Sequence, residues 1–307
     1  MKILILGAGG IGGYFGGQLL RSGADVTFLL REKRQTLIAA AGLRIETPHG
    51  NFTVQPPTVT ATSVTPIYDL IILAPKSYDL DDALASLENA VGSGVVLPFL
   101  NGIEHLAVLD RKFGRAKVMG GVAHIAAMIT ESGAVRQLND IHSLTVGPRD
   151  PAHAELARDF IALCGKAPFT SVYAEDVEQA LWDKWVFLAA LAGMTTLCRG
   201  SVGEILATPY GEGLLRQMYD ECCAVARLSA YPTGPAATQR ALGMLIAPGS
   251  PFTASMLRDL QAGQRTEHQH ILGAMAERGM ALGLTMDLLR LAHTHLAVQT
   301  GRLSANN

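Results

Sequence analysis

The chain begins with a short apolar run that leads directly into closely spaced glycines. Residues 2–6 have the length of a strand, and Gly7-Ala8-Gly9-Gly10-Ile11-Gly12 carries the G-x-G-x-x-G spacing. Helix-compatible sequence follows as far as Ser22-Gly23. In such a setting Gly7 permits a tight turn, Gly9 lets backbone N–H groups approach a pyrophosphate, and Gly12 lets helix and strand pack closely. We therefore predict a dinucleotide site at the N-terminus of this helix, formed by Gly7, Gly9, Gly10, Ile11 and Gly12.

Composition limits the class of protein. The 307 residues are enough for one large or two ordinary domains, and 49% of them are hydrophobic, which predicts a substantial core. The net charge is −2 and there is no basic block, so nucleic acid is not an expected partner. The four cysteines (Cys164, Cys198, Cys222 and Cys223) have no metal-ligand spacing. We expect them to be reduced and buried.

No targeting or membrane segment is expected. Glycines interrupt the first apolar run after Leu6, and no signal-peptide cleavage site follows it. The longest apolar stretch, residues 186–197, is too short and too rich in glycine and threonine to span a bilayer. These features predict a cytoplasmic protein without a membrane partner.

The second predicted strand, residues 25–30, bears on the choice of cofactor. It ends in Arg31-Glu32-Lys33-Arg34. An acidic side chain here binds the ribose 2′-hydroxyl of NAD, whereas an arginine accommodates the 2′-phosphate of NADP. Arg31, with Arg34 behind it, therefore favours NADP(H). The alternative is a solvated charged helix start, with which the adjacent Glu32 agrees.

Two continuous apolar runs, residues 69–74 and 94–100, are typical of strands in a parallel sheet covered on both faces. They lead into Pro75-Lys76 and Asn101-Gly102, and open α/β sheets place their ligands beyond the carboxyl ends of such strands. Lys76 and Asn101 are thus candidates for contact with cofactor or substrate. Alternatively they are an ordinary loop lysine and turn asparagine.

The remaining pattern predicts an α/β fold in two parts. Residues 43–60 alternate around a His-Gly-Asn turn and predict a β-ribbon, and residues 117–129 and 143–146 predict strands that close the sheet. Helical sequence covers 151–164, and 169–172 is a short final strand. From residue 174 onward the periodicity is helical, with breaks at Gly200, Pro209, 232–234 and 248–251. We predict a Rossmann-type dinucleotide-binding domain (1–173) and an all-helical domain (174–307), with the functional site in the cleft between them.

One lysine stands out in the apolar helix predicted for residues 174–198. Lys184 shares a helix face with Leu181, Leu188 and Leu191. In a desolvated cleft its pKa would fall, which makes a lysine a usable general acid near neutral pH. The alternative is a lysine whose stem is buried and whose ammonium group reaches water.

Residues 250–267 hold further candidates. Pro251 marks a helix start that places Ser255 in the first turns, and Asp259 and Glu267 follow. If one helix continues through Gly263, the two carboxylates lie about 80° apart around its axis. The ordinary alternative is a first-turn serine with surface carboxylates. Two histidine pairs, 268/270 and 293/295, are each two residues apart and point in different directions on a helix, so we expect no metal site.

Taken together, these residues resemble the ketopantoate reductase (2-dehydropantoate 2-reductase) family. The resemblance covers essentially the whole chain, and its motifs are Gly7–Gly12, Arg31, 74–76, 100–102, Leu181-Trp182-Asp183-Lys184, and 255–259 with 265–267. It implies NADPH-dependent reduction of a 2-oxo acid to a 2-hydroxy acid. The implied substrate is 2-dehydropantoate, reduced to pantoate in pantothenate and coenzyme A biosynthesis, or a close analogue. The helical domain would resemble the 6-phosphogluconate dehydrogenase C-terminal domain.

The resemblance also implies roles for individual residues. Lys184 would protonate the developing alkoxide, and Glu267 would orient the lysine or the substrate. Asn101, Ser255 and Asp259 would bind the substrate, while Lys76 and Asn101 would contact the cofactor. These roles are chemically sensible because the cofactor supplies the hydride and the protein supplies orientation and a cation where charge builds on oxygen.

The chain departs from the family pattern at two positions. The family usually carries asparagines four and eight residues after the lysine, and here these positions are Leu188 and Ala192. The specific substrate therefore stays open, although Thr195 and Thr196 are close enough in sequence to substitute. A non-catalytic NADP-binding regulator and a related 3-hydroxy acid dehydrogenase are the alternatives. A homodimer is possible.

Overall fold

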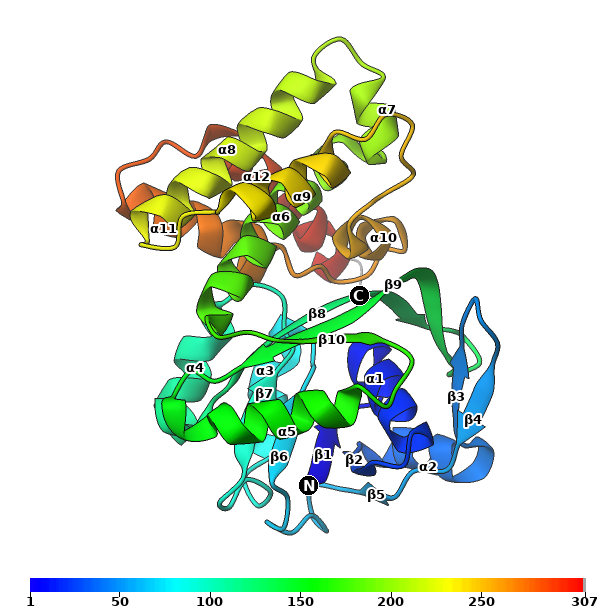
Figure 1. The fold of residues 1–307 in the computed structure, drawn as a ribbon. Coiled ribbons are helices and arrows are strands. Elements are labelled where there is room, and N and C mark those ends of the chain that lie inside the picture. Colours follow the sequence, from blue (N-terminus) through cyan, green and yellow to red (C-terminus); the bar gives the residue numbers. More distant parts are fainter. Residues whose placement is uncertain (306–307) are drawn as a thin grey trace. The chain divides into compact units, whose positions relative to one another are not determined.

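The computed structural model describes residues 1–305, and the chain divides into two compact units (Figure 1). Unit 1 comprises 1–100 and 105–180, and unit 2 comprises 101–104 and the chain from Leu181 onward. The division falls inside the first turns of helix α6 (Val177–Cys198), a few residues beyond the boundary expected at 173/174. The short segment 101–104 groups with the helical unit, which the sequence pattern does not predict.

Unit 1 contains the predicted parallel sheet. Its strand order is β5-β2-β1-β6-β7, and all pairings are parallel. The strands are β1 (Lys2–Leu6), β2 (Asp25–Leu29), β5 (Thr58–Val59), β6 (Leu70–Leu73) and β7 (Val95–Pro98). Every residue of β6 and β7 is buried, as continuous apolar strands in a parallel sheet require. The helices between these strands are α1 (Gly10–Arg21), α2 (Glu32–Ala41) and α3 (Leu80–Ser86), and α4 (Glu104–Phe113) follows β7.

A second sheet corrects one prediction. The strands expected to close the parallel sheet, β8 (Gly120–Ile129) and β9 (Val135–Gly147), instead form an antiparallel pair in a separate sheet. The 13-residue β9 pairs in parallel with β3 (Leu43–Glu46) and β10 (Thr170–Tyr173), so strands distant in sequence meet on it. β3 and β4 (Phe52–Val54) form the predicted ribbon, and α5 (Ala154–Cys164) precedes β10. β8 also begins three residues later than predicted, because 115–117 form a 3₁₀ turn and Val118 makes an isolated parallel bridge with Val96 of β7.

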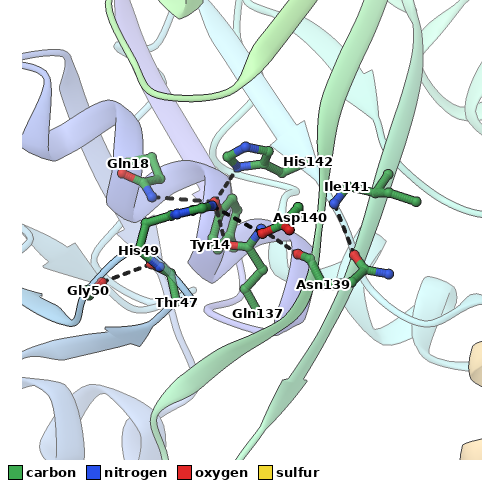
Figure 2. A network of polar contacts seen from close by, with 10 residues as sticks. All are labelled: Tyr14, Gln18, Thr47, His49, Gly50, Gln137, Asn139, Asp140, Ile141 and His142. Atoms are coloured by element: carbon green, nitrogen blue, oxygen red, sulfur yellow. Dashed lines mark hydrogen bonds and ion pairs between the residues drawn. The ribbon is translucent and has the colours of Figure 1, made fainter.

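Helix α1 is fastened to the second sheet by a polar network (Figure 2). The Gln137 amide donates to the Asn139 carbonyl, so its oxygen is the acceptor for the Tyr14 hydroxyl at 3.0 Å. Because the Tyr14 hydroxyl donates its proton to Gln137, its oxygen accepts hydrogen bonds from Gln18 and from Nδ1–H of His142, the latter at 2.6 Å. Burial raises the pKa of Tyr14 and lowers that of His142. The network therefore holds a neutral tyrosine and fixes the position of the helix that follows the glycine-rich loop.

Unit 2 is helical throughout, as predicted. Beyond Leu181 in α6, its elements are α7 (Val202–Leu206), α8 (Gly211–Leu228), α9 (Pro235–Leu245), α10 (Ser255–Gln261), a π-helical turn (Gln269–Gly273), α11 (Ala274–Ala281) and α12 (Asp287–Ala305). The four breaks from α6 to α10 fall at the predicted glycines and prolines, whereas the breaks after α10 and after α11 are not predicted. Its core is separate from that of unit 1 and is centred on α6, in which Trp185, Val186 and Ala189 are fully buried.

Three local predictions are wrong. α10 begins at Ser255 rather than near Pro251, because residues 251–254 are not helical. It ends at Gln261 and does not continue through Gly263, whose φ of +64° is incompatible with a right-handed helix. Asp259 and Glu267 therefore do not share a helix. Finally, Cys198 is exposed, whereas Cys164 and Cys222 are buried and Cys223 is partly so.

Candidate functional site

The glycine-rich loop in unit 1 has the geometry of a phosphate-binding turn. Gly7 adopts φ +85°, as a tight turn requires, and a Cβ on Gly12 would lie 2.6 Å from the Gly7 carbonyl oxygen, so a side chain there would prevent the close packing. Around Gly7 and Gly9 a Cβ would meet nothing within 4 Å. α1 starts at Gly10 without a side-chain cap, which leaves its first N–H groups for an anion. These residues fit a dinucleotide.

The two arginines after β2 lie in different environments. Arg31 precedes α2 and is 75% exposed, and its guanidinium forms a 3.3 Å ion pair with the equally exposed Asp82. Arg34 points instead to the glycine-rich loop and donates to the Ala8 carbonyl at 3.1 Å. Lys76 is partly buried and stands directly before the 3₁₀ turn that follows β6. All three positions therefore lie in unit 1, on the segments that follow β2 and β6.

Lys184 and Glu267 are two charged residues of unit 2 that interact electrostatically. Lys184 lies in the apolar α6, and Glu267 is only 5% exposed in the non-helical stretch before the π-helical turn. Desolvation lowers the pKa of Lys184 to about 8, and the Glu267 carboxylate opposes part of that fall. An ammonium group of this kind is protonated at neutral pH and gives up its proton readily, as a general acid requires.

Asn101 joins this pair. Its side-chain amide donates to Glu267 Oε2 at 3.4 Å. The next residue, Gly102, brings the backbone against the ring of His270, because a Cβ there would lie only 3.0 Å from His270 Cδ2. Burial lowers the pKa of His270, while Glu267 and a hydrogen bond to the Asn101 backbone raise it. Asn101, Lys184 and Glu267, chosen from sequence, thus come together in one unit.

His270 also lies in this cluster, although the sequence pattern does not single it out as a site residue. In the sequence it belongs to the histidine pair 268/270, and its position three residues after Glu267 is the one local signal that links it to the site. The π-helical turn that carries it is also anchored to α6, because Trp185 Nε1 donates to the buried Ile271 carbonyl at 3.0 Å. π-helical turns of this kind occur frequently at functional sites.

The other two substrate candidates, Ser255 and Asp259, lie on α10. Ser255 is the first residue of α10 and Asp259 lies one turn later, and both are partly exposed. Their contact with substrate stays a prediction. Within residues 1–305, no three histidine, cysteine, aspartate or glutamate side chains converge as a metal site requires.

The two positions that depart from the family pattern are apolar in structure as well as in sequence. Ala192 is completely buried, and Leu188 packs partly exposed against the core of unit 2. Thr195 and Thr196 are also completely buried, and their hydroxyls donate to the carbonyls of Leu191 and Ala192 in their own helix. The hydroxyl protons of both threonines are therefore already engaged within α6, and a contact of these threonines with substrate stays a prediction.

Comparison with known proteins finds matches to one family over nearly the whole chain. Residues 3–151 match the family described as ketopantoate reductase PanE/ApbA, and residues 176–299 match its C-terminal domain. An uncharacterized oxidoreductase of Bacillus subtilis, YkpB, is 32% identical over 96% of this chain and 98% of its own length. The 2-dehydropantoate 2-reductase of Halobacterium salinarum is 28% identical over 94% of this chain and 96% of its own.

Solved structures give the same result for the fold. A PanE/ApbA family ketopantoate reductase from Ralstonia eutropha superimposes with a TM-score of 0.87 at 26% identity, covering 99% of this chain and 100% of that one. A D-mandelate dehydrogenase solved with NADH and anilino(oxo)acetate has a TM-score of 0.88 at 20% identity, with the same coverage. In the described part of the chain, no helix has the length and apolar character needed to cross a membrane.

Proposed function

This chain belongs to the ketopantoate reductase family of oxidoreductases, and on that premise we propose that it reduces a 2-oxo acid with NADPH. The observation that carries the proposal is Lys184, a buried-helix lysine with a pKa near 8 beside the Glu267 carboxylate. A carbonyl reduction needs a proton donor at the oxygen as well as a hydride source, and Lys184 has the properties of the donor.

The proposed reaction divides the work between cofactor and protein. When bound, the nicotinamide supplies a hydride to the carbonyl carbon. The Lys184 ammonium group stabilises the negative charge that develops on the oxygen and delivers its proton there, which yields the 2-hydroxy acid. Glu267 keeps the lysine charged in its desolvated setting, and the Asn101 amide holds that carboxylate in place. Ser255 and Asp259 are proposed substrate contacts.

The preference for NADPH rests on Arg31. The glycine-rich loop and α1 fit the pyrophosphate of either cofactor, whereas Arg31 offers a cation where an NAD enzyme carries an acidic group. Because the Arg31 side chain is exposed and its ion pair is with an exposed carboxylate, it is available to a 2′-phosphate. A cytoplasmic location and a homodimer stay predictions.

We propose that the substrate side chain is aliphatic at the point where family members hold asparagines. Leu188 and Ala192 offer no hydrogen bond there, and the nearby threonine hydroxyls are committed to their own helix. A site without such groups gains little from a substrate hydroxyl. 2-Dehydropantoate, which carries that hydroxyl, is therefore one candidate among branched 2-oxo acids.

Oxidation of NADPH, followed by absorbance with a panel of 2-oxo acids, tests the proposal directly. The panel contains 2-dehydropantoate, branched aliphatic and aromatic 2-oxo acids, and a 3-oxo acid as control. We expect turnover of at least one 2-oxo acid and none of the 3-oxo acid. If NADPH binds but no member is reduced, the protein is a cofactor-binding regulator and the proposed reaction is wrong.

A further inference from the structure

We propose that Arg34 is a positioning residue that fixes the phosphate-binding loop for NADPH and NADH alike. The inference rests on the proposed function and concerns how unit 1 holds its cofactor. The guanidinium of Arg34 bridges two backbone segments: Nη2 donates to the Ala8 carbonyl at 3.1 Å, and Nη1 donates to the Gly133 carbonyl at 2.8 Å. Ala8 lies between the first two glycines of the loop, and Gly133 lies in the β8–β9 turn.

Two of the five N–H groups of the Arg34 guanidinium donate to backbone carbonyls, one from each terminal nitrogen. Its Nε is buried without a hydrogen-bond partner, and both terminal nitrogens already have carbonyl acceptors. Burial lowers the pKa of its guanidinium, which nevertheless stays charged. A charged donor held in this way strengthens its bonds to the two carbonyls and resists displacement. Its role is therefore to hold backbone in position.

The β8–β9 turn is shaped to receive this arginine. Gly133 adopts φ +81°, and a Cβ there would lie 3.0 Å from Arg34 Nη1 and 2.6 Å from Leu37 Cδ2. The turn is closed by bonds between Thr130 and Ala134 and from Gly133 to Thr130. Arg34 thus ties the phosphate-binding loop to a turn more than one hundred residues away in the chain.

A positioning role for Arg34 predicts a different effect on cofactor affinity from the one expected for Arg31. A group that contacts the 2′-phosphate discriminates between the two cofactors, whereas a group that holds the pyrophosphate loop affects both. The pyrophosphate is common to NADPH and NADH, and misplacement of the Ala8 backbone would weaken its hydrogen bonds in either case.

The experiment measures dissociation constants of NADPH and NADH by cofactor fluorescence for the wild type, Arg34→Ala and Arg34→Lys. We expect Arg34→Ala to weaken both cofactors by about tenfold or more and by the same factor within about twofold, as loss of a charge-assisted hydrogen bond implies. Arg34→Lys retains the charge but cannot bond both carbonyls, so we expect an intermediate loss. Arg44→Ala is the matched control, because Arg44 donates to Ser132 in the same turn and does not reach the loop.

A double-mutant cycle separates positioning from general destabilisation. Gly133→Ala should weaken both cofactors in the wild type, but add no further loss of affinity in the Arg34→Ala background, while its cost in melting temperature persists in both. Loss of NADPH affinity alone in Arg34→Ala would mean that Arg34 reads the 2′-phosphate and would overturn the inference. Unchanged affinity for both cofactors would also overturn it. Failure of the wild type to bind either cofactor would instead overturn the proposed function, and this inference with it.

Discussion

The side-chain amide of Asn101 donates a hydrogen bond of 3.4 Å to the Glu267 carboxylate, although 166 residues separate the two in the chain. Asn101 follows β7, and Glu267 lies between α10 and the π-helical turn. The hydrogen bond orients a nearly buried carboxylate whose charge acts on Lys184. The predictions for catalysis follow from this arrangement.

Replacement of the lysine tests its role as general acid. We expect Lys184→Ala to lower kcat by roughly 10²- to 10⁴-fold, the usual contribution of a positioned acid. NADPH affinity should be unchanged, because the glycine-rich loop and Arg31 lie in unit 1. Steady-state kinetics and a separate cofactor titration measure the two quantities. A mutant that turns over at the wild-type rate would show that Lys184 is only a core lysine.

The pH dependence of activity should report the Lys184 pKa. The protonated lysine is the active form, so kcat/KM should be level below pH 8 and fall as the pH rises through about 8. Glu267 raises this pKa, and Glu267→Gln removes its charge while keeping its shape. We therefore expect the falling limb to move to lower pH in Glu267→Gln. An unmoved limb, measured over pH 6–10 in constant ionic strength, would contradict the electrostatic role of Glu267.

Arg31 should determine the preference for NADPH. We expect Arg31→Ala to weaken NADPH by roughly 10- to 150-fold, from about 1.5–3 kcal/mol for a charged hydrogen bond, and to leave NADH nearly unchanged. The ion pair with Asp82 competes with the phosphate, but an exposed pair contributes at most about 1 kcal/mol. Asp82→Asn should accordingly improve NADPH binding by no more than about fivefold. Equal affinity of the wild type for both cofactors would refute this preference.

Leu188 should determine how the enzyme treats a substrate hydroxyl. We expect the wild type to reduce 2-dehydropantoate no better, in kcat/KM, than a 2-oxo acid with a purely aliphatic branched side chain. Leu188→Asn should shift the ratio toward 2-dehydropantoate, because an amide can pair with the hydroxyl. The ratio is measured for both proteins with both substrates. A wild-type preference for 2-dehydropantoate of about a hundredfold would show that other groups hold the hydroxyl.

Local patterns in the sequence predict most of the helices and strands, and they single out individual residues as candidates for chemistry. Three features follow from local preferences of backbone and side chain: the strand–glycine–helix opening, the fully apolar strands and most of the helical breaks. They can therefore be predicted without knowledge of tertiary contacts. Lys184 was recognisable because a lysine on an apolar helix face has few stable environments.

Tertiary structure decided which residues meet. The separate sheet built on β9, the grouping of 101–104 with the helical unit, and the contact of His270 with Gly102 all join distant segments, and no local pattern encodes such contacts. The same holds for the two arginines. Arg31 and Arg34 lie three residues apart and carry equal charge, but Arg31 is exposed whereas Arg34 is partly buried and donates to the Ala8 carbonyl. The two arginines differ because the function of a guanidinium group depends on which hydrogen-bond acceptors surround it. Those acceptors are brought there by the tertiary fold.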